Sequence, residues 1–128
     1  MRIAIDIMGT DHGPKELVLG AVNAVKKFGC EVVLVGDEEV AKEWLAKYNA
    51  LDNQKIKIQH ASQVINMDEH PAIAVKSKKD ASIVVASKML RAGECDALVS
   101  AGSTGAASVA AVLCVGRIKG VERPAIAT

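Results

Sequence analysis

Short apolar runs alternate with longer amphipathic segments along the chain. The apolar runs predict buried strands at residues 3–7, 32–35, 56–58 and 97–99. Apolar residues at helical spacing predict helices over residues 14–28, 38–48, 81–92 and 104–117. In the third strand apolar and polar residues alternate, which is typical of a strand near a sheet edge. Residues 61–71 lack a clear period and are interpreted as a loop.

Residues that start and stop helices support these boundaries. Pro14 suits the first helical position, where no backbone donor is lost, and Gly29 is placed to end that helix. Asp37 and Asp80 are predicted to be N-caps of the two following helices.

Strands that alternate with helices predict an α/β fold with right-handed crossovers. We expect a doubly wound, mostly parallel, Rossmann-like sheet with helices on both faces, in a single α/β domain over residues 1–128. Residues 125–127 resemble the start of a fifth strand. Because a natural domain rarely stops there, we expect the chain to be the N-terminal part of a longer, truncated protein.

Composition narrows the class of protein. Half of the residues are hydrophobic but only 2% are aromatic, which suits β-branched strands and alanine-rich helices. The net charge of +1 gives no indication of a nucleic-acid partner. Three cysteines without ligand spacing, and a first strand that begins almost at Met1, predict a cytoplasmic protein without a signal peptide. The longest apolar stretch, residues 105–116, is too short to span a bilayer but leaves peripheral membrane contact open.

Polar and glycine residues concentrate in two turns, after the first and the fourth strand. The first turn runs from Asp6 to Pro14 and the second from Ala101 to Ala106. In a doubly wound sheet these strands are neighbours, and ligands bind at the carboxyl ends of the strands. We therefore expect the two turns to face each other across one cleft.

The second turn has the residue types of a phosphate site. Gly102 and Gly105 permit close backbone approach, Ser103 and Thr104 offer hydroxyls, and a helix starts there. The sequence is neither a dinucleotide-binding fingerprint nor a Walker A loop. An ordinary Ser/Thr helix cap explains it equally well.

The first turn admits three interpretations. Asp6, Asp11 and His12 are candidates for metal binding or for acid–base work, and Asp11 also for a helix cap. A phosphatase with two aspartates needs the second one at position 8, where Met8 stands. No ligand spacing elsewhere supports a metal, so we expect neither a metal nor a cofactor. His60 and His70 carry no motif and are interpreted as solvated or structural.

Four ordered motifs resemble one known family. They are DIMGTDHGP at Asp6–Pro14, PAIAVKSKKDAS at Pro71–Ser82, AGSTGA at Ala101–Ala106 and GRIKGVERPA at Gly116–Ala125. Together they resemble the acyl-[acyl-carrier-protein]:phosphate acyltransferases (PlsX) of bacterial phospholipid synthesis. The resemblance implies a fold similar to those of isocitrate dehydrogenase and phosphotransacetylase. It also implies that inorganic phosphate attacks an acyl thioester on acyl carrier protein, in a cytoplasmic homodimer that associates with the membrane.

The resemblance, with the chemistry above, suggests site residues. Asp11 and His12 are assigned to catalysis, as the polarising or proton-handling groups, from their side-chain chemistry alone, because the resemblance does not assign catalytic roles. The predicted substrate-binding residues are Asp6, Gly9, Lys79, Ser82, Gly102, Ser103, Thr104 and Gly105. The chain departs from the family's usual residues at three positions, where it has Thr10 for Gly, Gly13 for Ala and Ser103 for Asn.

Overall fold

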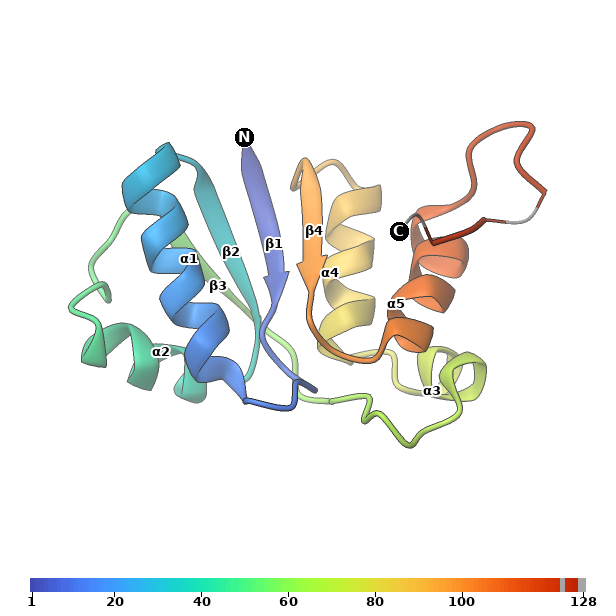
Figure 1. Cartoon of the computed structure of the whole chain (residues 1–128), viewed down its shortest axis with the longest axis horizontal. Helices are drawn as coiled ribbons and strands as arrows, with labels where there is room; N and C mark the ends of the chain where they lie inside the picture. Colours follow the sequence, from blue (N-terminus) through green and yellow to red (C-terminus); the bar gives the residue numbers. More distant parts are fainter. Residues whose placement is uncertain (123, 127–128) are drawn as a thin grey trace.

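A computed structural model describes residues 1–122 and 124–126 of the protein. A four-stranded, all-parallel sheet with the order β3-β2-β1-β4 lies at its centre (Figure 1). The strands are β1 (Arg2–Asp6), β2 (Glu31–Gly36), β3 (Ile56–His60) and β4 (Ala97–Ser100). The helices are α1 (Pro14–Phe28), α2 (Glu38–Lys47), α3 (Pro71–Ser77), α4 (Ser82–Arg91), α5 (Thr104–Ala110) and a π-helical turn, η1 (Ala111–Val115). The predicted α/β class with a parallel sheet is confirmed.

The sheet order places the first and fourth strands side by side, as predicted. β1 pairs with β2 on one side and with β4 on the other. In this register Asp6 lies opposite Ser100, at the carboxyl end of both strands. β3 pairs with β2 at one end of the sheet, in agreement with its alternating pattern.

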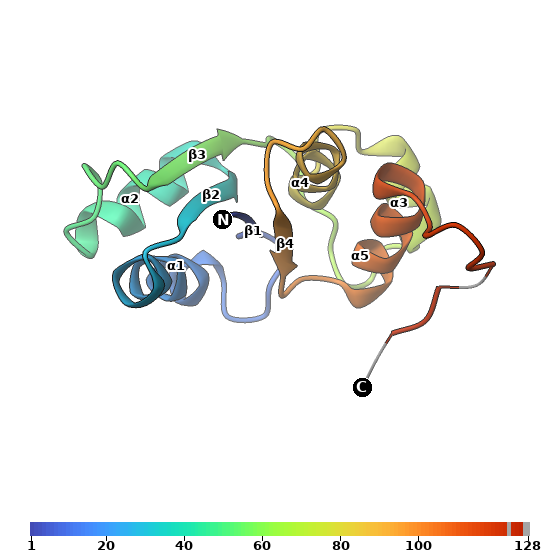
Figure 2. The same ribbon diagram turned by 90° about the horizontal axis from the view of Figure 1, so that it is seen from above.

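Helices cover both faces of the sheet (Figure 2). On one face, α1 and α2 pack against apolar side chains of the first three strands, and the largest buried members of this cluster are Ile7, Leu34, Leu45, Val18, Val22 and Val32. On the other face, Ala86 of α4 packs against Ala4, Val33 and Val35. The long runs of β-branched residues follow from this burial, because each side chain of a covered strand enters a core.

The segment between β3 and α4 differs from the prediction. Residues 61–70 form a loop as expected, but the short helix α3 begins at Pro71, which was predicted to belong to the loop. Only Ala74 and Val75 of this helix are buried, which is too few to give a helical period in the sequence. α3 packs against α5, and both lie beyond β4 in Figure 1.

Two predicted helix boundaries and one predicted strand differ from the structure. The N-cap of α4 is Ala81, because the Asp80 carboxylate instead accepts hydrogen bonds from the N–H and the hydroxyl of Ser62. The helical segment after β4 ends at Val115, before Gly116, whose φ of 106° is outside the helical range. Of the predicted fifth strand, Ala125 and Ile126 are not in a strand, and Ala127 lies outside the described residues.

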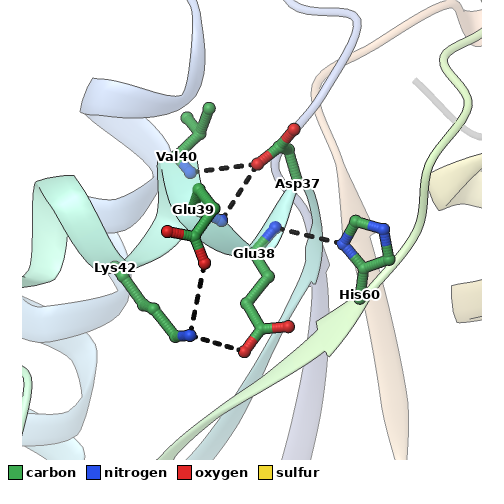
Figure 3. Close-up of polar contacts among 6 residues, drawn as sticks. All are labelled: Asp37, Glu38, Glu39, Val40, Lys42 and His60. Carbon is green, nitrogen blue, oxygen red and sulfur yellow. Dashed lines mark hydrogen bonds and ion pairs between the residues drawn. The ribbon is translucent and has the colours of Figure 1, made fainter.

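Polar side chains at the ends of β2 and β3 serve as caps (Figure 3). One carboxylate oxygen of Asp37 accepts from the N–H groups of Glu39 (2.9 Å) and Val40 (3.1 Å), as predicted. Nδ1 of His60 accepts from the N–H of Glu38 at 3.3 Å. The interpretation of His60 as structural is therefore confirmed.

Apolar side chains remain exposed beyond β4. An open groove of about 720 Å³ lies between α3, α5, η1 and the following segment, and its apolar lining includes Val109, Val112, Leu113, Ile118 and Val121. Within residues 1–122 and 124–126, no helix is both long and apolar enough to cross a membrane.

Candidate functional site

The two polar turns meet at the carboxyl ends of β1 and β4 (Figure 1). A Cβ atom at Gly102 would lie 3.4 Å from the carbonyl oxygens of both Met8 and Gly9. The backbone of the loop before α5 therefore rests directly on the backbone of the turn after β1. The assumed strand order correctly places the two turns together, but at this point they approach closely where a cleft was expected.

Gly9 is required in the first turn for two reasons. Its φ of +67° is in the left-handed region, which side chains other than glycine rarely adopt. A Cβ atom there would also lie 2.9 Å from the carbonyl oxygen of Ile65. The turn after β1 is thus held between Gly102 on one side and the loop before α3 on another.

Asp6 is buried beneath these turns, with an exposed fraction of 3%. Its Oδ2 accepts a hydrogen bond from the Ser100 hydroxyl (2.8 Å) and its Oδ1 accepts from the Met8 N–H (3.2 Å). Burial raises the pKa of the Asp6 carboxyl, while the nearby Ser82 hydroxyl and the hydrogen bonds from Ser100 and Met8 oppose this rise. Ser82, the first residue of α4, is equally buried at 3%.

The raised pKa of Asp6 predicts how stability depends on pH. A carboxyl with a higher pKa folded than unfolded stabilises the fold most when protonated. Relative to Asp6→Asn, the free energy of unfolding of the wild type should therefore fall as pH rises from about 4 through the folded pKa. Urea unfolding of both proteins across this pH range measures the difference.

Asp80 supplies the control for this titration. Hydrogen bonds from Ser62 lower the pKa of Asp80, so its contribution should be lost as pH falls through the folded pKa. The difference in the free energy of unfolding between the wild type and Asp80→Asn should therefore rise with pH. If the free energy of unfolding of the wild type relative to Asp6→Asn rose with pH, the raised pKa of Asp6 would be contradicted.

The loop before α5 is shaped by capping and by close packing. The Ser103 hydroxyl accepts from the N–H of Ala106 at 3.2 Å, so the capping interpretation of Ser103 is confirmed. A Cβ atom at Gly105 would lie 2.6 Å from Cγ of Pro71, the first residue of α3. Thr104 is exposed between these two residues.

The two residues assigned to catalysis lie on the surface of the first turn. Asp11 and His12 are both exposed. α1 has Gly13 at its N-cap position and no side-chain cap, so Asp11 does not cap it. The side chains of Asp11 and His12 therefore remain available to a ligand.

Two further residues named by the sequence are Thr10, whose hydroxyl is buried in the first turn, and Lys79, which lies in a separate hollow. The Thr10 hydroxyl oxygen is buried without a hydrogen-bond partner among the described residues. Lys79 is exposed and lines a shallow hollow with Lys76 and Lys88, beside Val84 and Leu113. The residues that line this hollow come from α3, α4, η1 and Lys79 itself, and none of them belongs to the two turns.

Of the predicted substrate-binding residues, the structure brings together Asp6, Gly9, Ser82 and Gly102, with Ser103 to Gly105 directly following. The residue that sequence reasoning missed is Ser100, which connects Asp6 to Gly102 by accepting from the Gly102 N–H at 3.2 Å. The sequence contained an indication of this role, because Asp6 and Ser100 are polar residues that each end a strand, and the two strands were predicted to be neighbours. Across the described part of the chain, no three His, Cys, Asp or Glu side chains cluster as metal ligands do.

Comparison with known proteins assigns a family. The family model described as "Fatty acid synthesis protein" matches residues 1–128. A "Phosphate acyltransferase" of Desulfitobacterium hafniense (strain DSM 10664 / DCB-2) is 53% identical over 128 residues, covering 100% of this chain and 38% of the relative. Proteins of the same name from Pelotomaculum thermopropionicum and Elusimicrobium minutum are 53% and 52% identical, over 99% and 98% of this chain and 36% and 37% of their own lengths.

The chain thus spans less than two fifths of the length of these relatives, which agrees with the prediction of a truncated protein. The family match covers every residue, including both turns and the Asp6–Ser100 pair. The chain belongs to the fatty acid synthesis protein family.

Proposed function

We propose that the full-length protein is a phosphate acyltransferase that forms acyl phosphate from acyl-[acyl carrier protein] and inorganic phosphate, for phospholipid synthesis. The observation that carries this proposal is the family match together with relatives named "Phosphate acyltransferase" at about half identity. The joined turns at the ends of β1 and β4 support it, because ligands of open α/β sheets bind at such a point.

The site chemistry suits attack of phosphate on a thioester. A phosphate oxygen bonds to the thioester carbonyl carbon, the C–S bond then breaks, and the thiolate of acyl carrier protein leaves and takes up a proton. Because a thiolate leaves readily, the reaction needs neither a strong general acid nor a cysteine nucleophile. It does need donors for the carbonyl oxygen as negative charge develops there.

The exposed groups of the two turns are assigned to these tasks. We place phosphate against the loop from Gly102 to Gly105, whose glycines admit close backbone approach. Asp11 and His12 are proposed to polarise the carbonyl or to move the proton, since both side chains are free at the surface. Lys79 remains a predicted phosphate contact.

A competition assay tests the proposed substrate. The full-length protein, incubated with phosphate and equal concentrations of long-chain acyl-[acyl carrier protein] and acyl-CoA, should consume the carrier-protein thioester first. Preferential use of acyl-CoA would indicate a related acyl-CoA phosphate transferase. Binding of phosphate without consumption of either thioester would indicate a phosphate-binding protein without turnover.

The same preparation should behave as a homodimer in light scattering and sediment with anionic vesicles, in line with a cytoplasmic protein that associates with the membrane.

Replacing Ser103 with Asn should leave activity unchanged or raise it a few-fold. Asparagine is as good an N-cap as serine, so it can keep the bond to the Ala106 N–H while adding an amide donor beside the Gly102 loop. The measurement is the steady-state rate of acyl phosphate formation by the full-length protein.

Ser103→Ala is the matched control for that substitution. It removes the cap and should cost about 1 kcal/mol of stability. A tenfold loss of activity in Ser103→Asn at unchanged stability would show that the candidate site of this chain does not use the residue usual in the family.

A further inference from the structure

We propose that Asp6 is a positioning residue, which acts through Ser100 to hold the Gly102 backbone in place against the turn after β1. The inference rests on the proposed function, in which the Gly102 loop contacts phosphate. It assigns Asp6 a role inside the protein, in place of the direct substrate contact that the sequence predicts.

The burial of Asp6 gives the first argument. With an exposed fraction of 3% and hydrogen bonds to both carboxylate oxygens, the side chain is enclosed by the protein. A carboxylate that reacts with or binds a substrate must instead reach it directly. Burying a charged group is costly, and the cost is offset where the group accepts several hydrogen bonds.

The direction of the hydrogen bonds gives the second argument. The Gly102 N–H donates to Ser100 Oγ at 3.2 Å, and the Ser100 hydroxyl donates to Asp6 Oδ2 at 2.8 Å. The ionised Asp6 carboxylate can only accept, so in this form it fixes the orientation of the Ser100 hydroxyl, and a lone pair of Ser100 then faces the Gly102 N–H. The other carboxylate oxygen holds the Met8 N–H at 3.2 Å.

One carboxylate therefore connects both turns of the site. The Met8–Gly9 segment and the Gly102 loop are bonded to opposite oxygens of Asp6, one directly and one through Ser100. Their backbones also touch, since a Cβ atom at Gly102 would be 3.4 Å from the Met8 and Gly9 carbonyl oxygens. Loss of the carboxylate should loosen the Gly102 loop without removing any group that contacts the substrate.

Hydrogen exchange and kinetics of the full-length protein test this role together. Asp6→Asn and Ser100→Ala should each speed amide exchange in a peptide covering residues 99–105 at least tenfold. Each should also lower kcat/KM for phosphate at least tenfold. Because both act through one contact, the double variant should lose little more than either single variant. Ser100→Thr, which keeps the hydroxyl, should restore slow exchange and activity.

Ser87→Ala is the control, because Ser87 is buried in α4 with a hydroxyl that has no partner among the described residues. It should change neither measurement. Unchanged exchange at residues 99–105 in Asp6→Asn, or strictly additive losses of kcat/KM, would overturn the proposal. Faster exchange in a protein that forms no acyl phosphate would instead leave the positioning role standing and refute the proposed function.

Discussion

Gly9→Ala is expected to lower the free energy of unfolding by about 2–4 kcal/mol and to remove most activity. The left-handed backbone at φ +67° costs a residue with a Cβ about 1–2 kcal/mol. The Cβ would also approach the Ile65 carbonyl oxygen to 2.9 Å, and such overpacking costs roughly 1–3 kcal/mol. Because the Gly9 backbone also touches Gly102, any shift that relieves the clash displaces one side of the candidate site.

Gly93→Ala separates the two contributions. Gly93 has a similar φ of +75°, but a Cβ atom there has no neighbour within 4 Å. This variant should lose only the backbone contribution, about 1–2 kcal/mol, and keep its activity. Equal losses of stability in the two variants, measured by urea unfolding, would mean that the loop of Ile65 does not constrain the turn.

Gly105→Ala is expected to lower activity at least tenfold, although alanine favours helices. Gly105 lies in the first turn of α5, and a Cβ atom there would be 2.6 Å from Cγ of Pro71. Pro71 is rigid and begins α3, so it cannot rotate out of the way. The start of α5 must move instead, and Ser103 and Thr104 move with it.

Gly20→Ala is the matched control for Gly105→Ala. Gly20 is also helical, in α1, but a Cβ atom there would meet nothing within 4 Å. The control should gain about 0.5–1 kcal/mol of stability and keep full activity. Gly105→Ala that matches this gain and remains active would show that α3 and α5 are not closely packed at this point.

The central sheet and the meeting of the two turns followed from the sequence. Buried β-branched runs separated by helical segments predicted the strands, and the doubly wound order predicted the pairing of β1 with β4. The predicted ends of α1 are also confirmed, because each depends on a single residue type, proline at position 14 and glycine at position 29. These features depend on backbone chemistry and burial, both of which a sequence pattern records.

The features that could not be predicted depend on contacts between distant segments. Asp80 looked like a helix cap but is bonded to Ser62, 18 residues earlier. α3 buries too few side chains to show a period, and it is fixed mainly by its packing against α5. Ser100 ends its strand as Asp6 does, but the register of β1 and β4 was needed to identify the two as hydrogen-bond partners.

The rate of acyl phosphate formation at increasing phosphate concentration tests most directly whether the two turns form one phosphate acyltransferase site. The full-length wild type should produce acyl phosphate from long-chain acyl-[acyl carrier protein] only when phosphate is present. His12→Ala in the first turn and Thr104→Ala in the second should each lower kcat/KM for phosphate at least tenfold, while Lys57→Ala, an exposed residue of β3, should not. No phosphate-dependent product from the wild type, or a loss confined to one turn, would contradict the account.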